Sequence, residues 1–466
     1  MLSRRSAQVL ASSLHSSVQK SFPAPSPSAP TTNILAEVRT RSAARSNLWV
    51  HRFNDKLSQL TAQSQPSVDQ APSPSISAAS SRLRMSDSFV QVFLPFRSDP
   101  SVAEQYQNPY ATGAIRMGKI LEELDALAFY VSHTYASNLE RPVTIATASV
   151  DRIDLISSIP IDQDISIFGY VTYTGNSSME VTIQMETLLP DKVHPADMDS
   201  AKYIRSKLPD EALSGSHLLT AKFIMVTRDP TTGKAAPLKQ LVLETEEERK
   251  IFEEGAANKA RKQSEAQSGL TKRAPSHDEM TLVHNMYMEY RKYVEERDTR
   301  LKVGFSGIVG GATALPKPAD IEWMRDTRIQ NIMLTFPQDR NLHGKVFGGW
   351  LMRLAFELGF ASAFMFSRAP VKFLALDDIS FRRPVEIGAI LDFEAQVVYT
   401  EPTGEIVVKV VAHVVEAEKG TRDMSNEFWF TFKSYDQEGV VRKRIMPRSY
   451  HDCMLYLEGK RRFERE

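Results

Sequence analysis

A polar loop that runs directly into an apolar helix is the stretch of this chain best suited to chemistry. The loop, Asp339-Arg-Asn-Leu-His-Gly-Lys-Val-Phe-Gly-Gly-Trp350, contains Asn341 and His343 and ends its polar part at Gly348-Gly349. Glycine lets another group approach the backbone closely, and the start of a helix offers unpaired N–H groups and a partial positive charge. This arrangement suits a carbonyl oxygen that gains negative charge during a reaction. A plain core helix after a glycine turn would give the same pattern.

The residues after Gly349 predict a buried helix. Apolar side chains go most of the way round the stretch from Leu351 to Phe364, which is typical of a core helix rather than a surface helix. Arg353 and Glu357 interrupt it, and it is too short to span a bilayer. Strand patterns follow over residues 371–376, 389–399, 406–415 and 428–434. One long helix followed by a run of antiparallel strands is an α+β pattern.

The first half of the chain repeats this order of elements. A helix is predicted over residues 115–131, and strands over 143–150, 165–174, 179–188 and 218–227. Gly118 aligns with Gly349, an offset of 349 − 118 = 231, and Val143 aligns with Val371, an offset of 371 − 143 = 228. A repeat of this size predicts two similar domains rather than a solenoid.

Two motifs in the second half resemble a known family. Asn-x-His-Gly-x-x-Phe-Gly-Gly-Trp-x-Met begins at Asn341, and Arg-Pro-Val-x-Ile-Gly begins at Arg383. They resemble the acyl-CoA thioesterase branch of the hotdog fold, in which a curved antiparallel sheet wraps around a central helix. With two tandem copies, the chain resembles the mitochondrial double-hotdog acyl-CoA thioesterases. The resemblance implies hydrolysis of fatty acyl-CoA to a free fatty acid and CoA without a cofactor, and a homo-oligomer that is a dimer or trimer of double-hotdog chains.

The resemblance also implies where the acid of the site lies, because the family carries a carboxylate on the central helix at a fixed distance after the glycines. Seven residues after Gly118 is Asp125, whereas seven residues after Gly349 is Phe356. The first helix therefore has the acid, and the second half has the complete glycine loop. We expect one composite site between the two domains, and a second site that is degenerate.

The resemblance gives each residue of the composite site a role. Asp125 would act as a general base or attack the thioester directly as a nucleophile. The N–H of Gly349, together with that of Gly348, would donate to the oxyanion. His343 or Asn341 would orient the carbonyl or the water.

Nearby residues leave alternatives open. Lys345 stands where some relatives have Asn, so an amide-dependent role at that position is in doubt. Glu357 adjoins the vacant acid position, but one step along a helix turns the side chain by about 100° away from the pocket. Arg382 and Arg383 are candidates for binding CoA phosphates, since Arg suits contacts with anions. Solvated charges at a strand edge are the alternative for both.

Composition divides the chain into five segments. Residues 1–45 are rich in Ser and Arg, with Glu37 the first acidic residue, and predict a mitochondrial transit peptide and a matrix location. Residues 46–85 predict a disordered linker. Residues 86–243 and 320–466 are the two predicted hotdog domains, and 244–319 is a charged, helical linker between them.

Several other functions lack support in the sequence. The net charge of +0 gives no electrostatic reason to bind nucleic acid, and the one cysteine, Cys453, excludes an internal disulfide or a cysteine metal site. We expect no metal, no cofactor and no membrane span. The chain has no Gly-x-Ser-x-Gly motif of the α/β-hydrolases. A hotdog hydratase acting on acyl thioesters and a non-catalytic acyl-CoA binding protein remain as alternatives, and release of CoA would distinguish hydrolysis from both.

Overall fold

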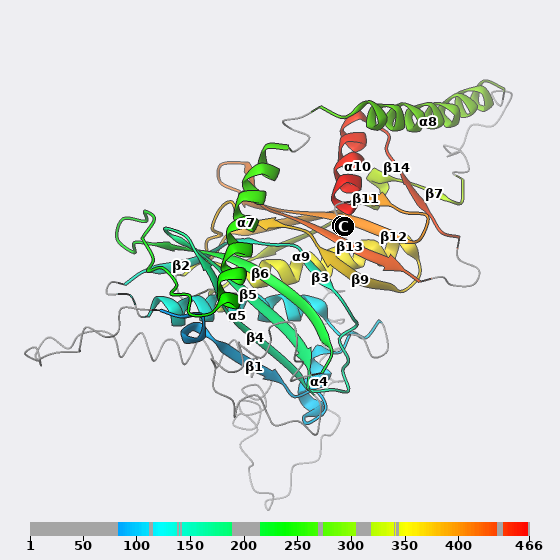
Figure 1. Cartoon of the computed structure of the whole chain (residues 1–466). Helices are drawn as coiled ribbons and strands as arrows, with labels where there is room; N and C mark the ends of the chain where they lie inside the picture. Colours follow the sequence, from blue (N-terminus) through cyan, green and yellow to red (C-terminus); the bar gives the residue numbers. More distant parts are fainter. Residues whose placement is uncertain are drawn as a thin grey trace, which may run out of the picture. The chain divides into compact units, whose positions relative to one another are not determined.

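Each half of the chain builds one long helix and a set of antiparallel strands (Figure 1). The computed structural model describes residues 83–110, 115–137, 139, 142–188, 215–268, 274–303, 318–339, 341, 344–435 and 441–464. All of these belong to one unit, Asp69–Glu466. The predicted transit peptide over 1–45 lies outside the described residues, as does most of the linker predicted after it. The domain boundaries themselves stay a prediction.

The central helices are α5 (Met117–Ala136) and α9 (Gly348–Ser367), close to where the sequence predicts them. The strands of the first half are β1 (Val90–Leu94), β2 (Thr144–Val150), β3 (Ile153–Leu155), β4 (Ile165–Thr174), β5 (Ser178–Thr187) and β6 (His217–Arg228). Those of the second half are β7 (Ile321–Trp323), β8 (Ile329–Leu334), β9 (Val371–Leu376), β10 (Ile379–Ser380), β11 (Ile390–Thr400), β12 (Glu405–Glu416), β13 (Thr421–Ser434) and β14 (Arg444–Met446).

The two halves share one large sheet. Its strand order is β1-β4-β5-β6-β3-β9-β13-β12-β11-β8, and β2 pairs with both β6 and β10. The halves join where Ile153 pairs with Leu376 and where Val150 pairs with Ile379. These two contacts are equivalent, because 379 − 153 and 376 − 150 both equal 226. Reciprocal pairing of this kind is the signature of a two-fold interface. The two repeats are therefore related by a pseudo-two-fold axis in the structure. The fold is α+β, with two tandem hotdog units.

The same axis passes between α5 and α9, which pack against each other. A Cβ placed on Gly118 would lie 3.2 Å from the carbonyl oxygen of Arg353, and one placed on Gly349 would lie 2.9 Å from that of Glu122. The two contacts are equivalent under the repeat, because Arg353 follows Glu122 by 231 residues and Gly349 follows Gly118 by the same number. The side chains of Glu122 and Arg353 form an ion pair of 3.3 Å at this crossing. The two glycines therefore let the helix backbones come into direct contact.

The segment predicted as a linker, residues 244–319, contains two helices that pack on the folded halves of the chain. Helix α7 (Glu246–Ser268) lies on the opposite face of the first half-sheet from α5 (Figure 1). A Cβ on Gly255 of α7 would lie only 2.5 Å from the Cβ of Tyr173. Helix α8 (His277–Val303) contacts the second half, where Glu279 pairs with Arg461 at 2.5 Å and Tyr290 packs edge-on against Trp323.

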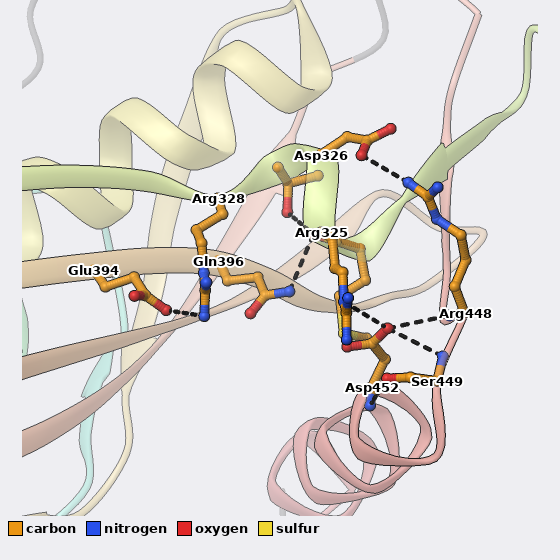
Figure 2. A network of polar contacts seen from close by, with 10 residues as sticks. Arg325, Asp326, Arg328, Glu394, Gln396, Arg448, Ser449 and Asp452 are labelled. Atoms are coloured by element: carbon orange, nitrogen blue, oxygen red, sulfur yellow. Dashed lines mark hydrogen bonds and ion pairs between the residues drawn. The ribbon is translucent and has the colours of Figure 1, made fainter. Parts of the chain in front are cut away.

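A C-terminal helix that the sequence analysis did not predict, α10 (Tyr450–Phe463), covers the second half-sheet as α7 covers the first. A Cβ on Gly459 would lie 3.0 Å from the Cβ of Tyr399, and Tyr399 follows Tyr173 by 399 − 173 = 226 residues. Figure 2 shows how the start of α10 is held: Asp452 accepts backbone hydrogen bonds from Arg448 and Ser449, and Arg448 pairs with Asp326 at 2.7 Å. Each half therefore has a sheet between two helices.

Replacing Gly255 with alanine tests whether α7 is a structural part of the first half. Alanine favours a helix over glycine by about 1 kcal/mol, so a helix that only tethers two domains would be stabilised. We expect the opposite, a loss of about 1–2 kcal/mol in unfolding free energy, because the new Cβ overlaps Tyr173. Urea unfolding followed by circular dichroism measures this. The control is Ala256→Gly at the exposed neighbouring position, which should cost about 1 kcal/mol if α7 unfolds with the domain. A more stable Gly255→Ala protein would contradict the packing.

Candidate active site

Asp125 from the first half lies at the start of helix α9 from the second half. Its side chain is completely buried. Its Oδ2 accepts a hydrogen bond of 2.6 Å from the backbone N–H of Gly349, and its Oδ1 accepts one of 2.9 Å from the hydroxyl of Thr147 on β2. The structure therefore brings together the acid and the glycine loop that the repeat predicts as one composite site.

Two glycines are needed for the carboxylate to reach the helix start. A Cβ on Gly348 would lie 3.0 Å from Asp125 Oδ2 and 3.2 Å from the ring of Phe381. A Cβ on Gly349 would lie 2.9 Å from the Cα of Glu122, one turn earlier on α5. A side chain at either position would push α5 and α9 apart and move the carboxylate away from the N–H groups. The positive end of the α9 dipole favours a negative charge at this place.

The N–H of Gly349 has a different partner from the one expected. The sequence interpretation assigns it to a substrate oxyanion, but in the structure it donates to Asp125. A carboxylate is a strong acceptor for the first N–H groups of a helix, and Asp125 lies close enough to use one. Gly349 therefore holds the acid in position, and any oxyanion donor has to share this N–H or be a different one.

The environment of Asp125 favours a base that works at neutral pH. Burial raises the pKa of Asp125 to about 6, while the hydrogen bonds from Thr147 and Gly349 hold the pKa down and the nearby charge of Glu122 raises it. The carboxyl group is then mainly ionised at pH 7 but is far more basic than an exposed aspartate. A general base is most effective when its pKa lies near the working pH.

A second buried carboxylate on the same helix is less suited to this role. Glu123 is almost completely buried and accepts a hydrogen bond of 2.6 Å from the hydroxyl of Tyr106. Burial raises the pKa of Glu123 to about 8, so this group is mainly protonated at pH 7. Of the two buried acids on α5, Asp125 is the one that carries charge under ordinary conditions.

The predicted loop residues are only partly visible. His343 lies outside the described residues. The side-chain oxygen of Asn341 accepts a hydrogen bond of 3.1 Å from the N–H of Lys345, and the N–H of Asn341 donates to the carbonyl of Lys345 at 2.7 Å. Gly344 between them has φ 71°, the left-handed conformation that favours glycine. Asn341 and Lys345 are thus joined by two hydrogen bonds across the turn at Gly344. The side chain of Lys345 forms an ion pair with Glu386.

The two predicted phosphate-binding arginines follow directly after a residue of the site. Phe381, whose ring packs on Gly348, is followed by Arg382 and Arg383. Arg383 forms an exposed ion pair of 2.7 Å with Asp423. Both arginines are exposed, and they directly follow in sequence the residue whose ring lies near Gly348.

The second, degenerate site has no carboxylate in the equivalent place. Phe356 occupies the position that Asp125 has in the first site, and a Cβ on Gly118 would lie 3.3 Å from its ring. Glu357 does not replace the missing acid: it forms an ion pair of 2.6 Å with Arg116 at the start of α5. The sequence analysis expected one helical step to turn Glu357 away from this pocket, but Glu357 lines the pocket together with Phe356.

Sequence reasoning missed Thr147, the second hydrogen-bond partner of Asp125. The sequence does show hydroxyl side chains on the predicted strand that contains Thr144-Ile-Ala-Thr147. Several threonines and serines lie on this strand, and the sequence does not distinguish between them. Which of them faces α5 depends on strand register, and β2 has a register irregularity between Thr147 and Ser149 in its pairing with β6. A bulge shifts the alternation of side chains, so the pattern alone does not identify the partner.

The fold and this site define the class of the protein: a double-hotdog chain with a buried acid at the start of the partner helix. The family model described as Thioesterase superfamily matches residues 117–189. The chain is 34% identical to mitochondrial acyl-coenzyme A thioesterase 9 of Bos taurus, over 82% of this chain and 78% of that protein. It is 33% identical to the protein of that name from Homo sapiens, with the same coverage.

One solved structure is similar to a part of this chain. An acyl-CoA hydrolase from Staphylococcus aureus, in complex with butyryl coenzyme A and coenzyme A, is 26% identical and covers 31% of this chain and 89% of its own, with a TM-score of 0.29. On the sequence relatives, the chain belongs to the family of acyl-CoA thioesterases. It is a thioester hydrolase.

Two other features of the described part bear on the expectations from sequence. None of the helices in that part is long and apolar enough to cross a membrane. No group of three or more His, Cys, Asp or Glu side chains is arranged to hold a metal ion within the same residues.

The buried charge of Asp125 predicts a pH-dependent stability difference between wild type and Asp125→Asn. The folded pKa, about 6, lies above the ordinary value of 3.8. Below pH 3.8 the group is neutral in both states, and as pH rises through 6 the folded protein loses the stability that the bound proton gives. We therefore expect the wild type to lose up to about 3 kcal/mol relative to Asp125→Asn between about pH 4 and pH 7.

Chemical denaturation at a series of pH values measures this difference. Asp162→Asn, which replaces an exposed carboxylate of the same half, is the control and should follow the wild type at every pH. A constant difference between wild type and Asp125→Asn would show that the carboxylate is not desolvated in the folded protein.

Proposed function

We propose that this chain hydrolyses fatty acyl-CoA to a free fatty acid and CoA at one composite site, with Asp125 as its acid. The observation that carries the proposal is the hydrogen bond between the Asp125 carboxylate and the N–H of Gly349, two residues 224 positions apart in sequence. A buried carboxylate costs free energy unless something holds it, and here both halves of the chain contribute to holding it. A carboxylate that is buried at this cost in free energy, at the start of a helix, fits a reacting group better than a packing role.

The proposed reaction follows from these contacts. The thioester carbonyl lies at the start of α9, and water attacks its carbon while Asp125 takes the proton of the water. Direct attack by Asp125, with a mixed anhydride that water then cleaves, is the alternative route. The C–S bond breaks, and the thiolate of CoA receives the proton held by Asp125. Thiolate is a good leaving group, so a separate strong acid is not required.

Other residues take supporting roles in this proposal. The N–H of Gly348 stabilises the oxyanion, while that of Gly349 keeps Asp125 in place and is shared with the oxyanion as charge develops. His343 or Asn341 orients the carbonyl or the water. Arg382 and Arg383 bind the phosphates of CoA, for which the guanidinium group is well suited.

Location and assembly complete the proposal. The mitochondrial names of the relatives and the Ser- and Arg-rich residues 1–45 support a place in the mitochondrial matrix. A homo-oligomer, either a dimer or a trimer of chains, is supported by β8. This strand is at one end of the sheet, and Ile332 and Leu334 on it are 63% and 52% exposed. An exposed apolar edge strand is suited to association with another chain.

Asp125→Ala should remove most of the activity. We expect a loss of about a hundredfold to ten-thousandfold in kcat, measured as release of the free CoA thiol from acyl-CoAs of short to long chain length, with an unchanged far-ultraviolet circular dichroism spectrum. Asp162→Ala, at an exposed position, should keep full activity. Equal turnover in Asp125→Ala would remove this residue from the mechanism. Binding of acyl-CoA by the wild type without any CoA release would place the protein in the non-catalytic class.

Thr147→Val should move the pH profile without destroying the site. In the wild type, kcat/KM should rise with pH through an apparent pKa of about 6, as Asp125 ionises. The hydroxyl of Thr147 stabilises the charged form of Asp125, so valine should raise the pKa and shift the rising limb to higher pH. The control is Thr144→Val on the same strand, where the hydroxyl donates to the carbonyl of Arg228 instead. A profile that stays fixed in Thr147→Val would argue against Asp125 as the titrating base.

A further inference from the structure

A cavity of about 820 Å³ lies at the degenerate site. One wall is the apolar face of α9, formed by Phe356, Phe360, Phe364 and Met365. Tyr110 also lines the cavity, with its ring 6.4 Å from that of Phe360 and 6.0 Å from that of Phe364. The volume lies within the range of about 300–1,000 Å³ that is usual for small-molecule sites.

This cavity is the pseudo-symmetric counterpart of the proposed active site. Phe356 and Asp125 are related by 356 − 125 = 231, the same offset that relates Gly349 to Gly118. Gly118 lines the cavity beside Phe356, just as Gly348 and Gly349 lie beside Asp125. The position that has a buried carboxylate in one site has a phenyl ring in the other. The neighbouring carboxylate that does line the cavity, Glu357, is held in an ion pair with Arg116.

The helix crossing separates this cavity from Asp125. The backbones of α5 and α9 touch at Gly118 and at Gly349, and the ion pair of Glu122 and Arg353 lies between these two contacts. A substrate chain at Asp125 cannot pass through this contact without separating the helices. The cavity therefore lies across the helix crossing from Asp125, and neither Asp125 nor Gly348 and Gly349 is among its lining residues.

The lining of the cavity identifies the chemical class of its ligand. The apolar wall from Phe356 to Phe364 spans eight residues of helix, or about 12 Å, and so suits a linear apolar chain. The ion pair of Arg116 and Glu357 lies at the Phe356 end of this wall, since Glu357 adjoins Phe356. The lining has two carboxylates, Glu104 and Glu357, and one guanidinium group, Arg116. An anionic head at that end would share Arg116 with Glu357, since a guanidinium group has several N–H donors.

We propose that this cavity binds a second acyl chain, attached to an anionic head, and does not hydrolyse it. The ligand is either acyl-CoA or the free fatty acid, because both combine a linear apolar tail with a negative head. This inference goes beyond the proposed function and rests on it only for the statement that the second site lacks the catalytic acid. The occupied fraction of the cavity would then depend on the concentration of acyl-CoA or fatty acid, in a chain whose other site carries out the proposed hydrolysis.

The test counts binding sites by isothermal titration calorimetry with a non-hydrolysable thioether analogue of dodecanoyl-CoA, and separately with dodecanoic acid. The full chain should bind two molecules of the analogue if acyl-CoA is the ligand of the cavity. If the fatty acid is the ligand, the chain should bind one molecule of the analogue, and in a second titration with the analogue already present it should still bind one molecule of dodecanoic acid. One bound molecule in the first titration and none in the second would overturn the proposal.

Two variants change the cavity in different ways. Ala361→Trp fills it, and Phe364→Asp places a charge in its apolar wall. Each should remove one bound molecule, that is, weaken this binding by at least tenfold, while the other molecule still binds. Ala260→Trp, at an exposed position of α7 that does not line the cavity, is the matched control and should keep both. Retention of both molecules in a folded cavity variant would overturn the proposal.

The number of bound molecules can be interpreted whether or not Asp125 is the catalytic acid. Asp125→Asn should still bind the same number of molecules as the wild type, although it no longer releases CoA. If Asp125→Asn hydrolyses acyl-CoA at the wild-type rate, the proposed function fails, while the count of binding sites still decides the inference about the cavity.

Discussion

The direct contact between the backbones of α5 and α9 is the constraint on which the rest of the structure depends. It needs glycine at 118 and at 349, because a side chain at either position would meet the carbonyl oxygen of the other helix within 3.2 Å. Close approach places the start of each helix against the middle of the other. That geometry is what lets a carboxylate on α5 reach the N–H groups of α9. Separation by even one methyl group would lengthen the 2.6 Å hydrogen bond between Asp125 and Gly349.

The tandem repeat allows this crossing to be asymmetric. In a dimer of identical chains, a residue at the two-fold axis meets its own copy, so Glu122 would face another glutamate and the two charges would repel. In one chain with two copies, the equivalent position is Arg353, and the two form an ion pair with side chains that are mostly buried. The pair gives the two central helices a preferred partner, which is a known use of partly buried charges.

The repeat explains how much could be read from the sequence. Strands such as β4 and β9 were predicted with their observed bounds, because each is a short apolar or alternating run next to a clear turn. The pairing of Asp125 with the glycine loop was also predicted, since the offset of 231 residues shows which half lacks which part. The prediction also needed the resemblance to the family, which implies a carboxylate at a fixed distance after the glycines of the central helix.

What could not be predicted depends on tertiary contacts. Helix α10 is held by ion pairs to residues far away in sequence: Arg461 pairs with Glu279 and Arg462 with Asp377. The role of α7 depends on Gly255 meeting Tyr173, two residues that no local pattern connects. The hydrogen bond from Gly349 to Asp125 was not predicted, for a similar reason. Sequence shows that an N–H is available at a helix start, but not which of two acceptors takes it.

The core around Phe356 is poorly suited to an acid at this position. The ring of Phe356 packs edge-on against Phe373 at 5.4 Å and against Phe430 at 5.6 Å, and tilted against Phe432 at 5.8 Å. An aspartate in this place would leave a cavity among these rings and would put a charge where aromatic side chains surround it. Both effects destabilise by several kcal/mol. The aromatic cluster therefore favours an apolar residue at position 356, and it opposes a buried acid at the second site.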